Sequence, residues 1–420
     1  MGTLRNLRLS HSGGSILTLG LLLPLFFSTP ALALPMFARK YKVDCNTCHA
    51  AVPRLNYTGF KFRTAGFRMP WEIGKTQDET ANLFENYNSF VGVISANVGI
   101  TSNSRPPGVA QFNGQELDIH PLTGSWGQSW SSRFETDFLP SGSLNFNQAF
   151  IGYTAGSPDT FWNFQAGLLP NFLGYGSFDR SLAVSLPLVL STSARNPQLD
   201  TLFNWSGPRA AGLTVSYWLG DTLLSASARD RLSVTAGGLD ALGTPSTNHI
   251  GDALLALTHF FDQKGAGSAL GLTYYKGQTH LNTATGSGLV YANNFSHLIG
   301  SVNYYITESM NAYLGGGWGQ DQLFNAASGN ADQRLFNSGI YGGLEYFWSG
   351  ELALGGRYDH VRTDLNTAGT DLSEATLYLH YRPINQIIFA SELQFVQNGL
   401  ASSMPGLDQS VLTAQATVAY

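Results

Sequence analysis

The sequence has little charge for its length. Asp, Glu, Lys and Arg make up 12% of the 420 residues, against roughly 25% in an ordinary soluble domain. After Phe27 the sequence also lacks any run of about 18 apolar residues, which excludes a bundle of membrane helices. Aromatic residues, in contrast, make up 12% of the chain, and there are 47 glycines. This combination is typical of a transmembrane β-barrel, whose strands alternate lipid-facing and lumen-facing residues.

Cysteine is nearly absent as well. The only two cysteines, Cys45 and Cys48, lie in the stretch "VDCNTCHA" and are followed directly by His49. This is the C-x-x-C-H pattern of a covalent c-type haem site. Two thiols three positions apart on one turn can add to the two vinyl groups along one porphyrin edge, and the adjacent histidine can bind the iron. The pattern predicts one haem c, with Cys45 and Cys48 as attachment residues and His49 as the axial iron ligand.

Other uses of a C-x-x-C pair have to be weighed against haem. A thioredoxin-like redox pair would need a βαβ context, and half of a zinc site would need further ligands nearby, and the sequence indicates neither. A structural disulfide is also possible, although it would give no role to His49.

The sixth iron position is less closely specified. No histidine other than His49 lies between residues 12 and 119, and Met69 is the best placed thioether. Methionine opposite histidine would raise the haem potential. An equal alternative is that Met69 packs beside Phe67 and Trp71, and a lumen-facing histidine such as His120 is a further candidate.

The N-terminal residues have the order of a secretory signal. Arg5 and Arg8 precede the apolar run Ile16–Phe27, which ends at the small-residue site Ala31-Leu32-Ala33. We therefore predict a signal peptide over residues 1–33 with cleavage after Ala33. The remaining chain is predicted to contain a monohaem cytochrome c segment at residues 34–80 and an outer-membrane, porin-like β-barrel at residues 85–420.

The barrel is clearest toward the C-terminus. Residues 412, 414, 416, 418 and 420 are apolar or aromatic and alternate with polar residues, which is the period of a strand with one apolar face. Long connections alternate with short turns such as 219–221, 307–309 and 348–351, as expected for extracellular loops and periplasmic turns. Aromatic residues flank each short turn and predict an interfacial girdle. The chain is thus predicted to be mainly β.

We expect about 16 antiparallel strands. Nine lie between residues 252 and 420, and seven lie near 88–100, 128–138, 143–155, 160–170, 199–206, 211–219 and 222–230. The segment 171–198 interrupts the alternation of long and short connections. It is either a loop folded into the lumen or a concealed strand pair.

Charge separates the two predicted parts. Residues 34–75 carry eight basic and two acidic side chains, a net charge of +6, whereas the whole chain carries −5. A cationic segment joined to an anionic barrel is suited to lie inside or against it. The alternative is that the basic side chains hold the haem propionates and solubilise a small domain.

One stretch of the segment resembles a known family. Phe37-Ala38, Cys45–His49, Pro53-Arg54-Leu55-Asn56 and Phe60–Gly66 are similar to the pattern of the fused outer-membrane cytochrome c–porin of iron-oxidising bacteria, the monohaem iron oxidase family. Ala50 departs from this pattern, because a hydroxyl residue is common there. The resemblance implies a bacterial outer-membrane protein that oxidises extracellular Fe(II) and passes electrons to a periplasmic cytochrome or copper protein.

Two functional classes follow from these observations. The leading hypothesis is one-electron oxidoreductase activity of the iron:cytochrome type, with electron export as its variant; it needs no catalytic acid or base. The alternative is a solute porin whose haem segment senses or gates. The expected partners are Fe(II) or another reductant, the periplasmic carrier and outer-membrane lipid, and no nucleic acid is expected.

Overall fold

The computed structural model describes most of the predicted strands and most of the N-terminal segment that contains Cys45, Cys48 and His49. The described residues are 36–52, 54–75, 92–99, 113–120, 122–138, 144–169, 182–183, 185, 187–191, 210–230, 250–262, 267–282, 290–325, 332–362, 371–384, 387–398 and 409–419. The predicted signal peptide at 1–33, the predicted strand at 199–206 and most of the long loops lie outside them.

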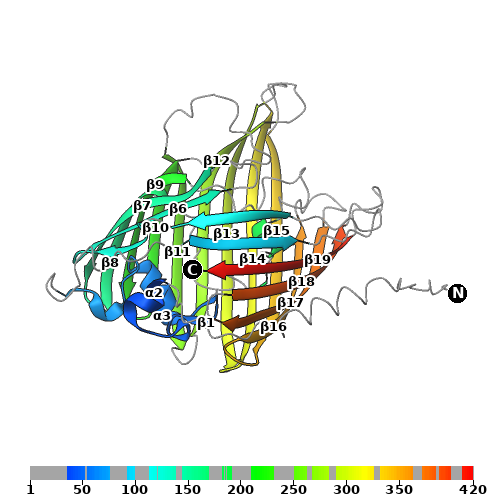
Figure 1. Ribbon diagram of the computed structural model, residues 1–420. Helices are drawn as coiled ribbons and strands as arrows, with labels where there is room; N and C mark the ends of the chain where they lie inside the picture. The colour runs from blue at the N-terminus through cyan, green and yellow to red at the C-terminus, as the bar shows by residue number, and fades with distance from the viewer. Residues whose placement is uncertain are drawn as a thin grey trace.

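Antiparallel strands form a closed barrel (Figure 1). Apart from β4 and β5, strands that follow one another in the chain pair side by side, as expected for antiparallel hairpins. The strands are β3 (Gly92–Gly99), β4 (Asn113–Ile119), β5 (Gly124–Trp126), β6 (Trp130–Phe138), β7 (Leu144–Gly156), β8 (Thr160–Leu169), β9 (Ala210–Leu219), β10 (Thr222–Asp230), β11 (Ile250–Asp262), β12 (Ser268–Asn282), β13 (Val290–Thr307), β14 (Met310–Asn325), β15 (Asp332–Phe347), β16 (Leu352–Arg362), β17 (Asp371–Ile384), β18 (Ile387–Asn398) and β19 (Gln409–Ala419).

The ring closes through short ladders near its two ends in the chain. β19 pairs with β3 between Ala416–Ala419 and residues 93–96, and β4 pairs with the C-terminal part of β6. The three-residue β5 pairs with the beginning of β6, so β4 and β5 follow one another along the same edge and occupy one position in the wall. Counted this way, the described strands fill sixteen positions. The number equals the predicted one, but its members differ, because β4 was not predicted and the predicted strand at 199–206 lies outside the described residues. Nine of these strands, β11–β19, form the C-terminal part, also as predicted.

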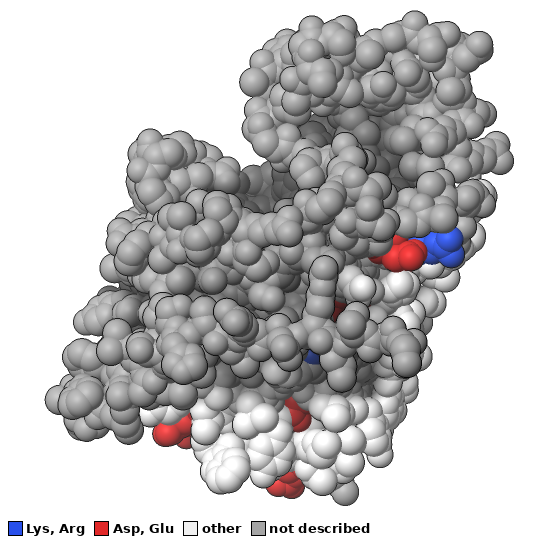
Figure 2. All heavy atoms as spheres, turned by 90° about the vertical axis from the view of Figure 1, so that its right-hand side faces the viewer, with Lys and Arg blue, Asp and Glu red and all other residues white. Residues whose placement is uncertain are grey.

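The two faces of the wall differ in polarity. Large apolar side chains such as Leu314 and Leu377 are 62% and 59% exposed, whereas Asp359 and Thr376 on the same wall are buried. Successive strand residues point to opposite faces, so the exposed apolar set faces outward and the buried polar set faces inward. On the face drawn in Figure 2 most described side chains are neither acidic nor basic. An apolar outer band around a polar interior identifies a membrane-spanning barrel of the bacterial outer-membrane type.

The aromatic residues beside the short turns divide between these faces. Phe261, Tyr304 and Trp348 are exposed on the outer surface, as a girdle requires, but Trp218 and Phe260 are fully buried. The prediction of one girdle from all of these rings was therefore wrong in part. Adjacent residues of a strand cannot both face lipid, so about half of the rings face the lumen instead.

The N-terminal segment packs against the inner face of the barrel, at the end where these short turns lie (Figure 1). It consists of α2 (Met36–Tyr41), the 3-10 turn η2 (Cys45–Thr47), the small hairpin of β1 (His49–Ala51) and β2 (Arg54–Leu55), α3 (Tyr57–Thr64) and the 3-10 turn η3 (Pro70–Glu72). Across the described residues, helices long and apolar enough to cross a membrane do not occur.

A second insertion comes from the segment 171–198. Its described residues contain the one-turn helix α4 (Leu188–Ser191). Leu188 and Val189 are fully buried and belong to a cluster with Tyr341 and Val361 on the inner face of β15 and β16. The amide of Leu188 donates to the Asp359 carboxylate at 3.1 Å. Of the two alternatives for this segment, the described residues match a loop folded into the lumen.

Candidate functional site

The two thiols extend from one tight turn. In η2 the amide of Thr47 donates to the Asp44 carbonyl at 3.0 Å, and the amide of Cys48 donates to the Cys45 carbonyl at 3.1 Å. In a 3-10 turn the side chains at positions i and i+3 eclipse one another. Cys45 and Cys48 therefore project on the same side of the backbone, which is the arrangement that attachment along one edge of a ligand requires.

Asn56 fixes this turn to the helix that follows it. Its side-chain amide donates to the carbonyls of Asn46 and Thr47 at 3.0 and 3.1 Å. Its side-chain oxygen accepts from the amide of Gly59 at 2.9 Å and so caps α3. Its backbone amide donates to the Cys48 carbonyl at 3.0 Å. The role of Asn56 could not be predicted from spacing, although the residue lies in the Pro53–Asn56 part of the family pattern.

Gly59 allows α3 to approach the thiol turn closely. A Cβ atom at this position would collide with the carbonyl oxygen of Cys48. Glycine is therefore required here by the close approach of two backbones. His49, in turn, begins β1 and lies opposite Leu55 in the β1–β2 hairpin, so its backbone is fixed by the same small unit that holds the thiols.

The thiols are free and differ in exposure: Cys45 is buried, whereas Cys48 and His49 are partly exposed. Burial raises the pKa of the Cys48 thiol to about 11, and the neighbouring Cys45 adds to the rise. Burial also raises the pKa of Cys45, and the Arg382 guanidinium opposes that rise. Both thiols are therefore mainly protonated at neutral pH. No group of three or more His, Cys, Asp and Glu side chains suited to hold a metal ion occurs among the described residues.

Met69 lies in the same apolar cluster as one thiol. The Met69 cluster consists of Phe62, Phe67, Met69, Phe150 and Leu169, and Cys48 packs against it. Met69 is completely buried, and its amide donates to the Glu72 carboxylate at 3.1 Å. It packs with Phe67, as the packing alternative expects, whereas Trp71 is 49% exposed and is not a member of the cluster.

His120, the other candidate for the sixth position, lies on the wall after β4. Its Nδ1 is 3.8 Å from a carboxylate oxygen of Glu135 on β6. Met69 is the candidate that shares an apolar cluster with a thiol, and the role of either residue as a ligand stays a prediction.

A buried ion pair joins the segment to the wall. Arg54 and Glu345 on β15 are 3% and 1% exposed, and the guanidinium nitrogen lies 2.6 Å from the carboxylate. The same guanidinium donates to Asn303, and the Glu345 carboxylate also accepts from Asn311 and Tyr378 at 2.7 and 3.1 Å. Paired and saturated with hydrogen bonds in this way, both charges can remain buried.

Further hydrogen bonds join the segment to the wall and to the short turns. Trp218 donates through Nε1 to Thr64 at 2.9 Å, and Tyr57 donates to Asp221 in the turn 219–221 at 3.0 Å. Arg382 donates to Asn46 at 3.3 Å and to the carbonyl of Gly350, in the turn 348–351, at 2.9 Å. These contacts place the thiol turn at the short-turn mouth of the lumen, which is the periplasmic end of an outer-membrane barrel.

Taken together, the residues present fit a covalently attached haem. Two thiols lie on one side of a turn, a histidine of fixed backbone follows them, and a fully buried thioether lies in the apolar cluster beside one thiol. Partial exposure of Cys48 and His49 leaves one side of the turn accessible.

Comparisons with known proteins show similarity in fold to outer-membrane barrels. No family model and no curated protein matches the sequence. Among solved structures, the chain is similar to the outer-membrane channel DcaP of Acinetobacter baumannii, with 13% identity, a TM-score of 0.49 and coverage of 79% of this chain and 95% of that one. It is also similar to an anion-selective porin from Comamonas acidovorans, with 14% identity, a TM-score of 0.46 and coverage of 79% and 99%. It is similar as well to a loop-deletion mutant of OmpT of Vibrio cholerae, with 13% identity, a TM-score of 0.47 and coverage of 79% of this chain and 98% of that one. The similarity is to porin-like outer-membrane barrels.

Proposed function

We propose that the chain carries electrons through the outer membrane by means of a haem c bound to Cys45 and Cys48, with His49 as an iron ligand. The observation that carries the proposal is the position of the C-x-x-C-H turn inside the periplasmic mouth of the barrel, where the buried Arg54–Glu345 pair fixes it. A segment of this size is too small to enclose a haem alone, so it needs the wall for packing.

When bound, haem c supplies reversible one-electron chemistry at its iron. The residues of the chain provide the rest. The thiols of Cys45 and Cys48 would anchor the group, His49 would bind the iron, and Met69 would be a candidate for a second iron ligand. Asn56 orients the Cys45–Cys48 turn through its hydrogen bonds, and the Met69 cluster keeps water from the side of the turn where Cys48 packs against it.

The proposed electron donor and acceptor follow from the family resemblance and from the orientation of the barrel in the membrane. Fe(II) arriving from outside would give up one electron and leave as Fe(III), and the electron would pass to a cytochrome or copper protein in the periplasm. The hydrocarbon layer is about 30 Å thick, so the position of the turn at the periplasmic mouth favours contact with the periplasmic carrier. Export of electrons to an outside acceptor uses the same parts in reverse.

A solute porin is the second candidate, and the polar inner face of the closed barrel favours it. In that function the N-terminal segment would close or gate the short-turn mouth. The two candidates differ in one property, because only the first requires a redox-active centre.

Stopped-flow visible spectroscopy separates them. The purified, oxidised full-length protein is mixed with Fe(II), and dithionite serves as a reference reductant. Rapid appearance of the reduced α and β bands with Fe(II) supports iron oxidation. Bands with dithionite alone would contradict the Fe(II) assignment and favour either export or a porin whose haem segment senses or gates. Absence of bands, together with ion conductance in planar bilayers, would leave the porin.

A further inference from the structure

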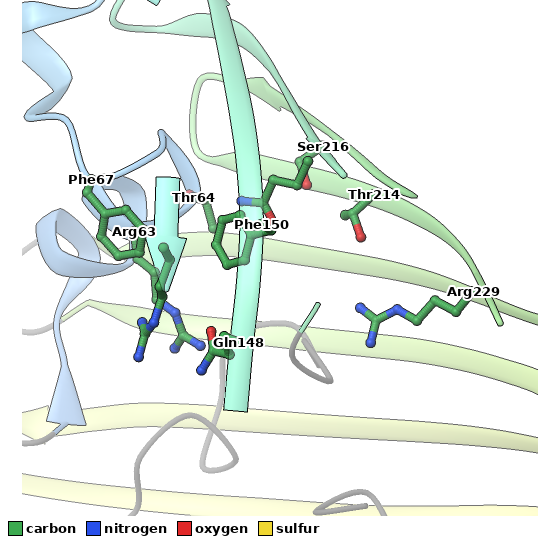
Figure 3. A pocket seen from close by; sticks show the side chains of 10 residues that line it. Arg63, Thr64, Phe67, Gln148, Phe150, Thr214, Ser216 and Arg229 are labelled. Carbon is green, nitrogen blue, oxygen red and sulfur yellow. The ribbon is translucent and has the colours of Figure 1, made fainter. Parts of the chain in front are cut away.

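Three arginines converge on one small pocket between the segment and the wall. Arg63 comes from α3, Arg133 from β6 and Arg229 from β10, and the side chains that line the pocket include no acidic residue. Figure 3 shows Arg63 beside Gln148, with Arg229 extending toward them from the other side. The free volume is about 30 Å³, which is room for a small ionic group and too little for a macrocycle.

The charges at this pocket contrast with those at the Arg54 anchor. Arg54 of the segment lies against a carboxylate of the wall, whereas Arg63 of the same segment lies at a pocket that two wall arginines already line. Arg133 has a carboxylate partner, Glu135, which also accepts from Gln148 at 2.9 Å. Arg229 lies opposite the buried Asp252 of β11. Docking of α3 therefore brings a third guanidinium group to a pocket whose own lining includes no carboxylate.

The donor set indicates which chemical group this pocket would bind. Guanidinium groups present paired N–H donors that match carboxylate and phosphate oxygens. The lining adds the amide side chains of Gln148 and Gln165 and the hydroxyl groups of Thr214 and Ser216. Arg229 is 2% exposed and Gln148 is 6% exposed, so the pocket contains buried donors rather than surface charges alone.

We propose that this arginine pocket binds an oxyanion of the carboxylate or phosphate class. Two sources can supply it. One is a propionate of the haem proposed above, because Phe67 and Phe150 line the pocket and also belong to the Met69 cluster against which Cys48 packs. The other is a free anion that enters through the lumen. The first source rests on the proposed function, and the second is independent of it.

Binding of inorganic phosphate to the full-length protein tests the pocket. Equilibrium dialysis with labelled phosphate is carried out on a Cys45→Ala/Cys48→Ala variant, which cannot hold haem covalently, and on the wild-type protein. We expect the double-cysteine variant to bind phosphate and Arg229→Gln in that background to weaken binding at least tenfold, whereas Arg229→Lys weakens it less. Arg362→Gln is the matched control, because Arg362 forms an exposed pair with Asp371; it should leave phosphate binding unchanged. Heat-modifiable gel mobility reports that each variant retains its barrel.

The wild-type protein shows whether the bound oxyanion is a haem propionate or a free anion. If it binds phosphate as well as the double-cysteine variant does, the natural ligand is a free oxyanion. If it no longer binds phosphate, and Arg229→Gln lowers the midpoint potential of the haem because a nearby positive charge is lost, the ligand is a propionate. Failure of the double-cysteine variant to bind phosphate, or binding that Arg229→Gln does not weaken, would overturn the proposal. Absence of haem would overturn the proposed function and leave the phosphate result standing.

Discussion

Two sides of the lumen hold the N-terminal segment in different ways. Toward β13–β15 the contact is a buried ion pair, Arg54 with Glu345, surrounded by amide and phenol hydrogen bonds. Toward β8, β9 and β11 the contact is an aromatic cluster around Phe60, Trp218 and Phe260 with one indole hydrogen bond to Thr64. The first side depends on a few strong interactions with strict geometry, and the second depends on the apolar surface area that the aromatic rings bury. Loss of one partner should therefore cost far more on the charged side.

Arg54→Met should have the largest effect. It leaves the Glu345 carboxylate buried without its cation, and removal of one partner of a buried pair costs about 3–5 kcal/mol. If undocking of the segment opens the lumen, the open fraction in planar bilayers should rise by about two to four orders of magnitude. Arg362→Met is the control, because exposed pairs contribute only about 0–1 kcal/mol. Equal conductance of the two variants would contradict the role of Arg54 as anchor.

Gly59→Ala should have the next largest effect. It acts on the contact between α3 and the Cys45–Cys48 turn, and both sides of the lumen hold this part of the segment. The new Cβ would collide with the Cys48 carbonyl, and such overpacking costs about 1–3 kcal/mol. Hydrogen exchange of the α3 amides should become faster by the corresponding factor. In Gly300→Ala, where the nearest atom would be 3.8 Å from the added Cβ, exchange should not change. Slow exchange of α3 in Gly59→Ala would show that the two backbones are not held together.

Thr64→Val tests the aromatic side. The substitution removes the acceptor of the Trp218 indole N–H, a hydrogen bond of about 1 kcal/mol. Trp218→Phe removes the donor and keeps an aromatic ring in the cluster. A double-mutant cycle read by exchange of α3 should give a coupling of about 1 kcal/mol between the two sites. Strictly additive effects would mean that Trp218 acts through packing alone.

The smallest effect concerns pH. Burial lowers the pKa of Lys40, which donates to Ser125 at 2.9 Å, to about 8 from its ordinary value near 10.5. Between these two pH values the unfolded segment binds more protons than the folded one, so raising the pH from 8 toward 10.5 should stabilise the docked segment. Lys40→Met should remove this slope, and exchange measured at pH 8 and pH 10 is the readout. Equal changes in the stability of the wild-type and Lys40→Met segments over this interval would contradict the assignment to Lys40.

Much of the wall could be predicted because its information is local. In β11–β19 the alternation of apolar and polar residues persists over strands of at least 11 residues, and the short turns give the register. β4 was not predicted, because "NGQELDI" is short, carries two acidic residues and has only a weak apolar period. The division of the aromatic girdle was missed for a different reason, since composition near a turn does not say which ring faces inward.

The site could be predicted only in part. The C-x-x-C-H spacing is local and marks the thiols, but the place of the segment in the lumen depends on contacts between residues far apart in sequence. Arg54 and Glu345 are 291 positions apart, and neither has a pattern around it that names the other. The charge difference between segment and barrel indicated attraction in general and could not distinguish the Glu345 anchor from the arginine pocket.

The central claim is that Cys45 and Cys48 hold a haem covalently at the mouth of the barrel. The most direct test expresses the full-length chain in a host that matures c-type cytochromes and stains a denaturing gel for haem, beside a Cys45→Ala/Cys48→Ala variant. We expect haem to remain with the wild-type polypeptide under denaturing conditions, with about one haem per chain by pyridine haemochrome, and to be absent from the variant. A wild-type barrel that folds and migrates without haem would contradict the account.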